Sequence, residues 1–482
     1  MMSSEVWSRS RWTSLVVFLL LLFPVISVQN SEDATLTIDT TAAIAETDSS
    51  YICVTLDWWP PDKCNYNRCP WGSSSVLNLN LSHPLFAKAI QGFDSLRVRI
   101  GGSLQDGVVY NVGNVTWECG PFKKKFGGLF GYSTGCLSME RWDELLSFFK
   151  KTGVKLTFGL NALYGRQHHI LRFWGGDWDP TNARDFVSYT LSKGYHVDSW
   201  EFGNELCGTG IGASVGAKQY GKDVIVLKNM VDDLEVRTNN KPPASIVAPG
   251  GFYASWWFDE FVQASGQNTV NAVSLHLYTL GSGNARNVKD KILSPRFLDK
   301  ASSTLKDLNA TIEQFGPWAS IWVSESGGAF NNGAKDVSDT FLNSFWYLDQ
   351  LALAATHNAK VYCRQSLVGG FYELLDQNTF VPNPDYYSAL LWHKLMGERV
   401  LDVSSSGSMF LRAYAHCTKK RDGVTLLLIN LSGQTTYDLD VETSDYLELK
   451  TGTKSGKHFA DGLKKAVSWL GNRASDEDLT RE

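Results

Sequence analysis

The chain has 482 residues, of which 43% are hydrophobic and 12% aromatic, and its formal net charge at pH 7 is −5. A chain of this size can bury a large core, and we expect more than one compact domain. The near-neutral charge balance argues against nucleic acid as a partner, because proteins that bind it carry a strongly basic surface.

The N-terminal segment has the features of a secretory signal peptide. Arg9 and Arg11 precede the apolar run SLVVFLLLLFPVISV, and small residues follow around Ser27. The run is too short to cross a membrane comfortably, and no later segment approaches the length of a membrane span. We therefore expect a secreted, soluble protein from which residues 1–27 are removed.

The cysteines and glycosylation sequons fit an extracellular location. Cys64 and Cys69 are close neighbours, and Cys119 and Cys136 flank a glycine-rich loop, so each pair could form a disulfide. Neither pair has the CxxC spacing of a zinc site. Sequons that could carry surface glycans start at Asn80, Asn114, Asn309 and Asn430.

The middle of the chain alternates between β-rich runs and helix-like segments. Eight β-rich runs occur, at residues 52–59, 95–102, 155–162, 197–205, 245–251, 272–278, 320–326 and 360–370. The clearest helix covers 138–153, where apolar residues recur at helical spacing and Gly153 provides a stop signal. Strands that alternate with helices indicate parallel βαβ units. Eight such units predict an α/β fold, a (β/α)8 TIM barrel, over residues 51–396.

A different pattern follows the barrel. Short β-rich runs at 409–418, 423–432 and 436–442 are separated by glycine, serine and charged turns, which predicts a smaller β domain over residues 397–482. The early segment ATLTIDTTAAI also has β character. We expect residues 28–50 to pair with this C-terminal domain rather than with the barrel.

Two glutamates end strands of the predicted barrel. In WEFGNEL, Asn204 and Glu205 follow the fourth strand, and in VSESGG, Glu325 ends the seventh. An isolated Asn-Glu pair is commonly a cap or a surface carboxylate. The working residues of TIM barrels, however, lie at the C-terminal ends of the strands, and two opposed carboxylates suffice for glycoside hydrolysis. Asn204 could then hydrogen-bond the sugar 2-hydroxyl.

Several motifs together resemble the heparanase-like enzymes of glycoside hydrolase family 79. SLRVRIGGSLQD, WEFGNEL, SLHLY, WVSESGGAFNNG and YELLDQNTFVPNPDYYSALLWHKLMGERVL carry the resemblance, which runs from about Thr55 to Val403. It implies a retaining β-glucuronidase in which Glu205 is the acid/base and Glu325 the nucleophile. Further site residues implied by the resemblance are Arg99, His276 and Tyr278 around the nucleophile, Tyr372, Asn331, Asn332 and Gly333 at the uronate carboxylate, and Asp57 and Ser103 along the sugar site.

The chain also departs from the family pattern. Asn331 and Asn332 stand where heparanase has glycines, and the basic groups that hold sulfated chains are sparse, for example near Gly283. No excised linker occurs between the second and third strands, so we expect a single chain and a monomer. The polar sequence after Asp445 lacks further strands, which predicts a shortened, β-sandwich-like C-terminal domain.

The resemblance is closest to the plant members of the family. It implies glucuronate-bearing glycans as substrates, such as cell-wall arabinogalactan proteoglycans, cleaved in endo or exo mode. Small phenolic glucuronides are an alternative, and a non-catalytic glycan-binding protein is another, although a lectin would not need both glutamates. No cofactor and no metal are expected. The expected location is the cell wall or apoplast, with peripheral membrane association or the vacuole left open.

Other sequence features have simpler explanations than a functional site. The segment CGTGIGASVG, with Asp232 and Asp233 beyond it, resembles a dinucleotide fingerprint, but its glycine spacing is imperfect. His168 and His169 lack carboxylates at metal-ligand spacing. The run Lys123–Lys125 reads as a solvated loop. Four tryptophans are candidates for stacking on sugar rings, although most tryptophans are core residues: Trp58, Trp59, Trp256 and Trp257.

Overall fold

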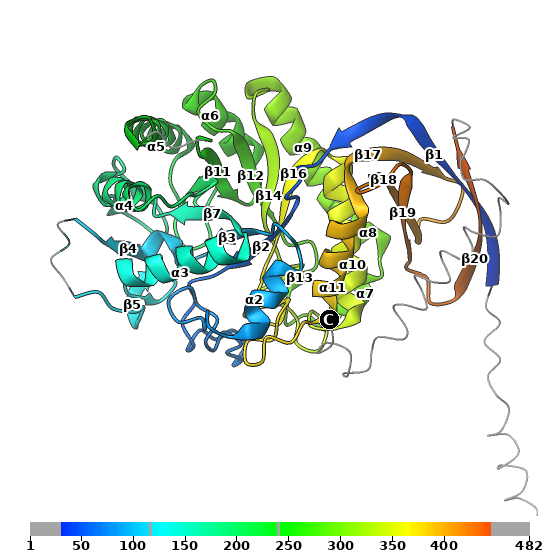
Figure 1. Ribbon diagram of the computed structural model, residues 1–482, viewed down its shortest axis with the longest axis horizontal. Helices are drawn as coiled ribbons and strands as arrows, with labels where there is room; N and C mark the ends of the chain where they lie inside the picture. Colours follow the sequence, from blue (N-terminus) through cyan, green and yellow to red (C-terminus); the bar gives the residue numbers. More distant parts are fainter. Residues whose placement is uncertain (1–29, 114, 116–117, 239–241, 445–482) are drawn as a thin grey trace, which may run out of the picture.

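The computed structural model describes residues 30–113, 115, 118–238 and 242–444. The predicted signal peptide, the sequon at Asn114 and the segment 445–482 therefore lie outside the described residues. Figure 1 shows a helix-surrounded barrel with a β sheet beside it. No helix among the described residues is long and apolar enough to cross a membrane.

The eight predicted barrel strands are all present, and the α/β fold class is confirmed. In chain order they are β2 (Ile52–Leu56), β3 (Arg97–Ile100), β7 (Lys155–Leu160), β10 (Ser199–Phe202), β11 (Ser245–Gly251), β12 (Ala272–Leu277), β14 (Ser320–Ser326) and β16 (Ala359–Arg364). They pair in that order, and β16 closes the barrel against β2. Every pairing in the barrel is parallel. The C-terminal ends of all eight strands consequently meet at one mouth.

Helices cover the outside of the barrel (Figure 1). They are α2 (Pro84–Gln91), α3 (Met139–Thr152), α4 (Thr181–Ser192), α5 (Ala217–Thr238), α6 (Ser255–Ser265), α7 (Val288–Ile292), α8 (Pro295–Leu298), α9 (Lys300–Phe315), α10 (Phe341–Thr356) and α11 (Pro384–Leu395). The helix α3 ends as its sequence predicts. The Ser138 side chain accepts a hydrogen bond from the Arg141 N–H, and Gly153 takes a left-handed backbone with φ 73°.

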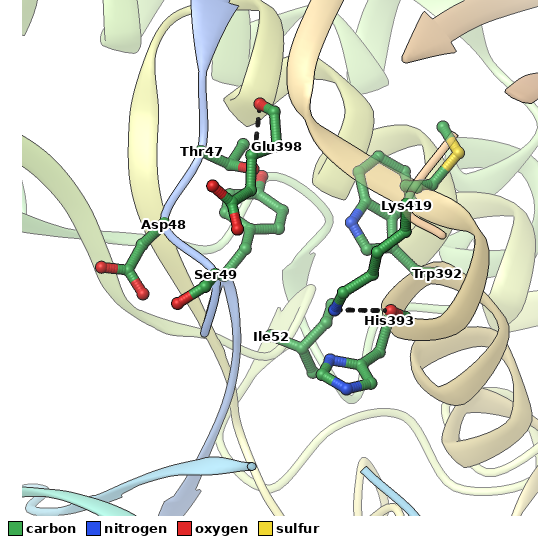
Figure 2. Close-up of a pocket in the computed structure, with 10 residues that line it drawn as sticks. Thr47, Asp48, Ser49, Ile52, Trp392, His393, Glu398 and Lys419 are labelled. Carbon is green, nitrogen blue, oxygen red and sulfur yellow. Dashed lines mark hydrogen bonds between the residues drawn. The ribbon is translucent and has the colours of Figure 1, made fainter. Parts of the chain in front are cut away.

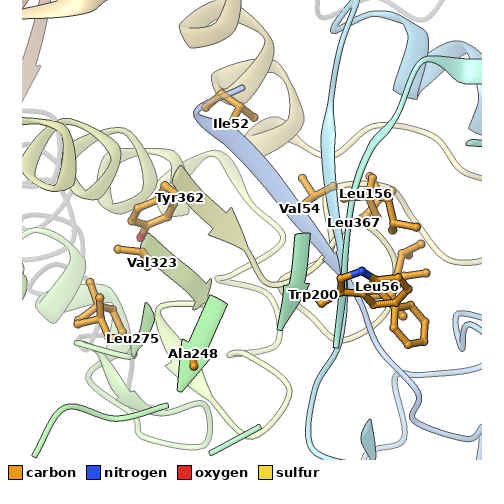
Figure 3. Close-up of a cluster of buried hydrophobic side chains, with 14 of the residues drawn as sticks. Ile52, Val54, Leu56, Leu156, Trp200, Ala248, Leu275, Val323, Tyr362 and Leu367 are labelled. Carbon is orange, nitrogen blue, oxygen red and sulfur yellow. The ribbon is translucent and has the colours of Figure 1, made fainter. Parts of the chain in front are cut away.

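Apolar side chains from the strands fill the space between sheet and helices (Figure 3). Val54, Leu56, Trp200, Leu275 and Val323 are each at most 1% exposed. Some strands nevertheless alternate apolar with polar or charged residues, as in RVRI of β3 and SWEF of β10, and all residues of these two strands are buried. Charged side chains inside such strands need partners, which makes them informative about the site.

The loops between the barrel strands and helices contain short strands and a 3-10 helix. They are η1 (Gln105–Gly107), β4 (Val108–Asn111), β5 (Lys124–Leu129), β6 (Gly135–Ser138), β8 (Gln167–His168), β9 (Trp174–Gly175), β13 (Gly281–Ser282) and β15 (Ala329–Phe330). The parallel pair β13 and β15 joins the loops that follow β12 and β14. These two loops are thereby held together beside the seventh strand.

The smaller β domain is a five-stranded sheet in the order β19-β18-β17-β1-β20. Its strands are β1 (Asn30–Glu46), β17 (Met396–Ser405), β18 (Leu411–Thr418), β19 (Val424–Asn430) and β20 (Thr435–Thr443). The first strand, β1, pairs antiparallel with β17 and parallel with β20. The strand β17 was not predicted, because Gly397, Glu398 and Arg399 interrupt its apolar residues and leave no continuous β-rich run. One sheet is present there within the described range 30–444.

A narrow crevice marks the junction between the barrel and this sheet (Figure 2). The Thr47 N–H donates to the Glu398 carbonyl at 2.8 Å, and the Lys419 Nζ donates to the His393 carbonyl at 2.9 Å. The crevice offers about 10 Å³ of free space. It lies at the start of β2, away from the strand ends that form the mouth, and is too small for a sugar.

Three disulfides connect six of the eight described cysteines, and Cys207 and Cys417 are free. The two predicted pairs, Cys64–Cys69 and Cys119–Cys136, are confirmed. The third, Cys53–Cys363, was not predicted and joins β2 to β16, where the barrel closes. Its partners are 310 residues apart in the sequence but neighbours in the sheet.

Candidate active site

Two buried glutamates face each other at the mouth of the barrel. Glu205 follows β10 and is 8% exposed, while Glu325 lies in β14 and is 7% exposed. One carboxylate oxygen of each, together with a ring nitrogen of His276, forms a group whose atoms all lie within 4.8 Å of one another. The predicted pair is therefore brought together, with room between the carboxylates for a reacting atom.

Arg99 organises the floor of the site. Its guanidinium, fully buried in β3, donates to Glu201 Oε2 at 2.6 Å, to Glu325 Oε2 at 2.9 Å and to Asn204 Oδ1 at 2.8 Å. Glu201 lies in β10 and is fully buried. Arg99 thus neutralises two buried carboxylates and orients the amide, since an unpaired buried charge would be costly.

The surroundings of Glu325 favour its ionised form. Tyr278 donates its O–H to Glu325 Oε1 at 2.7 Å, while Arg99 binds the other oxygen. Burial alone would raise the pKa of Glu325, but the nearby His276 and Arg99, with the hydrogen bond from Tyr278, outweigh it and lower that pKa below its usual value. An ionised carboxylate with both oxygens held is suited to act as a nucleophile.

Glu205 lies in a different environment. His276 Nδ1 lies 3.0 Å from Glu205 Oε1, and the other ring nitrogen of His276 is buried without a partner in the described structure. Glu205 has a left-handed backbone with φ 54°, which is uncommon for a residue other than glycine and concentrates at functional sites. Its N–H donates to the Gly250 carbonyl at 2.7 Å, which holds the turn in place.

The side-chain amide of Asn204 is only half satisfied. Arg99 fixes its Oδ1, and its Nδ2 is buried with no hydrogen-bond partner among the described residues. The backbone N–H of Asn204 donates to Asp106 Oδ2 at 2.8 Å. Burial raises the pKa of Asp106 to about 7 despite two backbone hydrogen bonds. The unpartnered Nδ2 is placed to donate to a sugar hydroxyl.

The loop after β14 supplies a second set of free donors. Asn331, Asn332 and Gly333 take successive left-handed conformations, with φ of 60°, 77° and 79°. Asparagine tolerates this region better than other side chains, which explains how it can stand at positions where glycine would be expected. Within the described chain, the backbone N–H groups of these three residues have no acceptor.

Tyr372 lies against the same loop. Its ring packs on Gly333 and Gly327, and a Cβ on Gly327 would come within 3.0 Å of the rings of both Tyr278 and Tyr372. Glycine at 327 therefore lets the two tyrosines approach each other. Gln365 Nε2 lies 3.4 Å from the Tyr372 hydroxyl, a long contact that leaves the hydroxyl able to bind substrate.

Asp57 closes the site on the side of β2. Its Oδ1 accepts from the Trp58 N–H at 2.7 Å and its Oδ2 from Gln365 Nε2 at 3.0 Å. Burial, together with the negative charge of Glu325, raises the pKa of Asp57 to about 7. Ser103, half-buried beyond β3, makes no hydrogen bond to either glutamate in the described structure.

Three contributors to the site were not predicted: Glu201, Asp106 and Gln365. Glu201 and Asp106 lie inside the motifs WEFGNEL and SLRVRIGGSLQD, and Gln365 lies in the β-rich run 360–370, but no role was assigned to them. A signal was nevertheless present, since Glu201 and Arg99 are charged residues inside otherwise apolar strands, and such residues require each other.

The remaining candidate residues lie in the core or on the surface. Trp58 is buried, and Trp257 is buried with its N–H donating to the Val215 carbonyl, whereas Trp256 is 61% exposed. His168, at the end of β8, and His169, which follows it, are both exposed. Asn80 and Asn430 are exposed, while Asn309 is half-buried within α9. Glycan attachment at these sequons stays a prediction.

The group formed by Glu205, His276 and Glu325 has ligand atoms close enough to hold a cation. Arg99, which donates to Glu325, already supplies positive charge there. A cation would have to compete with this guanidinium for the same carboxylate. A metal-independent reaction therefore stays our expectation.

Comparisons with known proteins agree with this geometry. Residues 33–352 match the N-terminal domain of glycosyl hydrolase family 79. Heparanase-like protein 2 of Arabidopsis thaliana is 55% identical over 472 residues, which cover 97% of this chain and 87% of the relative. Baicalin-beta-D-glucuronidase of Scutellaria baicalensis is 39% identical over 417 residues, which cover 84% and 78%.

A solved structure supports the architecture alone. A GH51 arabinofuranosidase from Xanthomonas axonopodis pv. citri superposes with a TM-score of 0.62 at 12% identity, covering 86% of this chain and 88% of that chain. At this identity the likeness shows a shared fold and not a shared substrate.

Proposed function

The chain belongs to glycoside hydrolase family 79, and from this premise we propose that it is a retaining β-glucuronidase. The observation that carries the proposal is the opposed pair of Glu205 and Glu325, with one oxygen of each within 4.8 Å. Retaining glycosidases hold their carboxyl groups about 5–5.5 Å apart, whereas inverting enzymes need about 6.5–9.5 Å to admit a water. The short separation favours attack by a carboxylate.

In the first step, Glu325 attacks the anomeric carbon while Glu205 donates its proton to the departing oxygen. The bond between the anomeric carbon and the leaving group breaks as a glycosyl ester with Glu325 forms. Arg99 and Tyr278 keep Glu325 ionised and aligned for this attack. The Asn204 amide donates to the 2-hydroxyl, a contact that strengthens in the transition state.

In the second step, Glu205 removes a proton from water, whose oxygen attacks the same carbon. The ester to Glu325 breaks, and the sugar leaves with its original β configuration. His276, which contacts Glu205, is placed to keep that carboxyl pointed at the reacting oxygen in both steps. The same glutamate therefore serves first as acid and then as base.

The substrate's carboxylate would be held by neutral donors. The free N–H groups of Asn331, Asn332 and Gly333 and the Tyr372 hydroxyl lie together beyond the nucleophile. Such donors would be left unpaired by a glucoside, so discrimination can be large. Glucuronate-bearing glycans, such as cell-wall arabinogalactan proteoglycans, are the proposed substrates of this site.

A second candidate substrate class is small phenolic glucuronides. Phe252 is 36% exposed, and its ring centroid lies 6.3 Å from that of His276 and 6.1 Å from that of Tyr278. This ring offers an apolar face beside the acid, where an aromatic leaving group could stack. The Scutellaria relative is named as a β-D-glucuronidase that acts on baicalin.

We also propose that the protein is secreted. The signal-like N-terminus and the three disulfides support this, because disulfides persist in oxidising compartments. The plant relatives make the cell wall or apoplast the proposed site of action. A monomer stays our expectation.

A panel of chromogenic substrates tests the activity. We expect kcat/KM for 4-nitrophenyl β-glucuronide to exceed that for the β-glucoside and β-galactoside by at least about 100-fold. Equal rates on glucuronide and glucoside would refute the uronate assignment while leaving the two-glutamate mechanism intact. No hydrolysis of any of the three by folded protein would refute the enzyme assignment itself.

A further inference from the structure

The loop of residues 58–71 follows β2 at the barrel mouth. A disulfide between Cys64 and Cys69 links two of its residues. Trp59 and Trp71, at its two ends, are 6% and 1% exposed, and their ring centroids lie 6.4 Å apart. This loop is therefore a packed structure rather than a loose connection.

Two aromatic residues from the segment 124–132, which belongs to the connection after β3, complete this packing. The ring of Trp59 lies 5.7 Å from that of Phe130 and 6.0 Å from that of Tyr132. Phe130 also reaches the loop after β10, because a Cβ on Gly212 would overlap its ring. We call Trp59, Trp71, Phe130 and Tyr132 the aromatic wall.

Loop 58–71 is also tied to the loops that hold the proposed carboxylate site. Trp71 Nε1 donates to Asn332 Oδ1 at 2.9 Å, and the Trp71 ring lies 6.3 Å from that of Tyr372. The Pro70 carbonyl accepts from the Gly370 N–H at 2.7 Å. Asn331 Nδ2 donates to the Tyr66 hydroxyl at 3.0 Å. The wall thus stands directly beside the donors proposed for the uronate.

The chemistry of the sugar places its C4 at this wall. In a pyranose, C1 and C4 are opposite corners of the ring, and C4 is the neighbour of C5, which bears the carboxylate. Glu205 serves the oxygen on C1, so C4 points away from β10. In the ring of eight strands, β16 is opposite β10, and β2 is next to β16. The loop after β16 carries Tyr372, and the loop after β2 carries Trp59 and Trp71 of the wall. The other half of the wall, Phe130 and Tyr132, comes from the connection after β3, the next strand along the barrel.

From this arrangement we propose that the aromatic wall closes the sugar site at C4, so that the protein removes terminal glucuronate and rejects glucuronate that carries a further sugar on C4. The proposal rests on the proposed function, because it takes the carboxylate donors as given. It answers whether cleavage is endo or exo: the wall excludes the internal residues of a 4-linked chain. The leaving group remains free to extend past Phe252, on the side of β11.

The test compares 4-nitrophenyl β-glucuronide with the same compound bearing a 4-O-methyl or a 4-O-glucosyl group. For the wild-type protein we expect kcat/KM to fall by at least about 100-fold with the 4-O-glucosyl group, since the added ring would clash with the wall. The methyl group should have a smaller effect. Hydrolysis of the glucosyl-capped and uncapped compounds at similar kcat/KM would overturn the proposal.

Substitutions in the aromatic wall test whether the wall, and not another part of the site, causes the slow hydrolysis of the 4-O-glucosyl substrate. Trp59→Ala and Phe130→Ala should each reduce the capped-to-uncapped penalty by at least about tenfold, whereas Trp59→Phe should largely keep it. Phe341→Ala, which truncates a 63% exposed ring on α10, is the matched control and should leave the penalty unchanged. If neither alanine variant reduces the penalty, the wall is not its cause and the proposal fails.

The ratio of kcat/KM for the uncapped substrate to that for the 4-O-glucosyl substrate tests this proposal separately from the proposed function. Activity on the uncapped compound reports folding and the β-glucuronidase activity of each variant, and Phe130, being half-buried, provides a milder change than Trp59. If the protein prefers β-glucosides, the uronate assignment fails. The wall is then tested with the glucoside and its 4-O-glucosyl form, with the same expected penalty and the same refuting result.

Discussion

Replacing Tyr278 with phenylalanine should move the acidic limb of the pH profile. The substitution removes the O–H that donates to Glu325 Oε1 at 2.7 Å and keeps the ring that packs on Gly327. Glu325 must be ionised to attack, so activity is lost as the pH falls through its pKa. Removing a donor to the ionised form raises that pKa, and the limb shifts to higher pH.

The size of the shift follows from the strength of this hydrogen bond. A hydrogen bond to a buried charged group contributes about 1.5–3 kcal/mol, and one pKa unit corresponds to about 1.4 kcal/mol. The acidic limb should therefore rise by about 1–2 pH units. Arg99, which donates to the other oxygen at 2.9 Å, remains in place and limits the change.

The assay is kcat/KM for 4-nitrophenyl β-glucuronide between about pH 3 and pH 8, because this parameter reports the pKa values of the free enzyme. Tyr362→Phe is the matched control. It removes a buried hydroxyl that donates to Ser326 Oγ at 2.9 Å, outside the carboxylate pair, and should leave the limb in place. An unmoved limb in the Tyr278 variant, or equal shifts in both variants, would refute the reasoning.

Three further predictions concern the acid, the uronate and the barrel closure. Glu205→Gln should lose most turnover on substrates with poor leaving groups, while azide should partly rescue hydrolysis of those with good leaving groups; equal loss on both without rescue would contradict its role. Tyr372→Phe should weaken the preference for glucuronide over glucoside by about 1–3 kcal/mol, measured as a ratio of kcat/KM values. Replacing Cys53 and Cys363 with serine should lower the free energy of unfolding, measured by urea titration, by about 2–5 kcal/mol. Removing the Cys64–Cys69 disulfide should lower it less, because that disulfide closes a much shorter loop in the unfolded chain.

The sequence was sufficient for the architecture because each barrel strand has a local signal. A short apolar run bounded by glycine or a polar turn, repeated eight times between helices, has few alternative solutions. The strand β17 (Met396–Ser405) was missed because Gly397, Glu398 and Arg399 interrupt its apolar residues. The disulfide Cys53–Cys363 escaped because we paired only cysteines close in sequence, although a closed barrel makes its first and last strands neighbours.

Site residues could be predicted only where they lie in a motif whose function is recognisable from the sequence. Glu205 and Glu325 end strands with recognisable sequences, and the structure places them together. Asp106 ends the motif SLRVRIGGSLQD, but the motif gives no sign that its carboxylate accepts from the Asn204 N–H, so only the fold reveals this contact. Likewise, the contact between Phe130 and Trp59 joins two loops whose conformations depend on tertiary packing, which local sequence patterns do not encode.

The most direct test of the central claim is to trap the glycosyl-enzyme. A 2-deoxy-2-fluoro-β-glucuronyl fluoride should react with the protein and leave its sugar on one carboxylate. The fluorine on C2 slows both steps, but the good leaving group on C1 speeds the first step, so the glycosyl-enzyme accumulates. Peptide mass spectrometry should find the adduct on Glu325, at the end of β14. An adduct on Glu205, or turnover of the parent glucuronide with inversion and no adduct, would contradict the account.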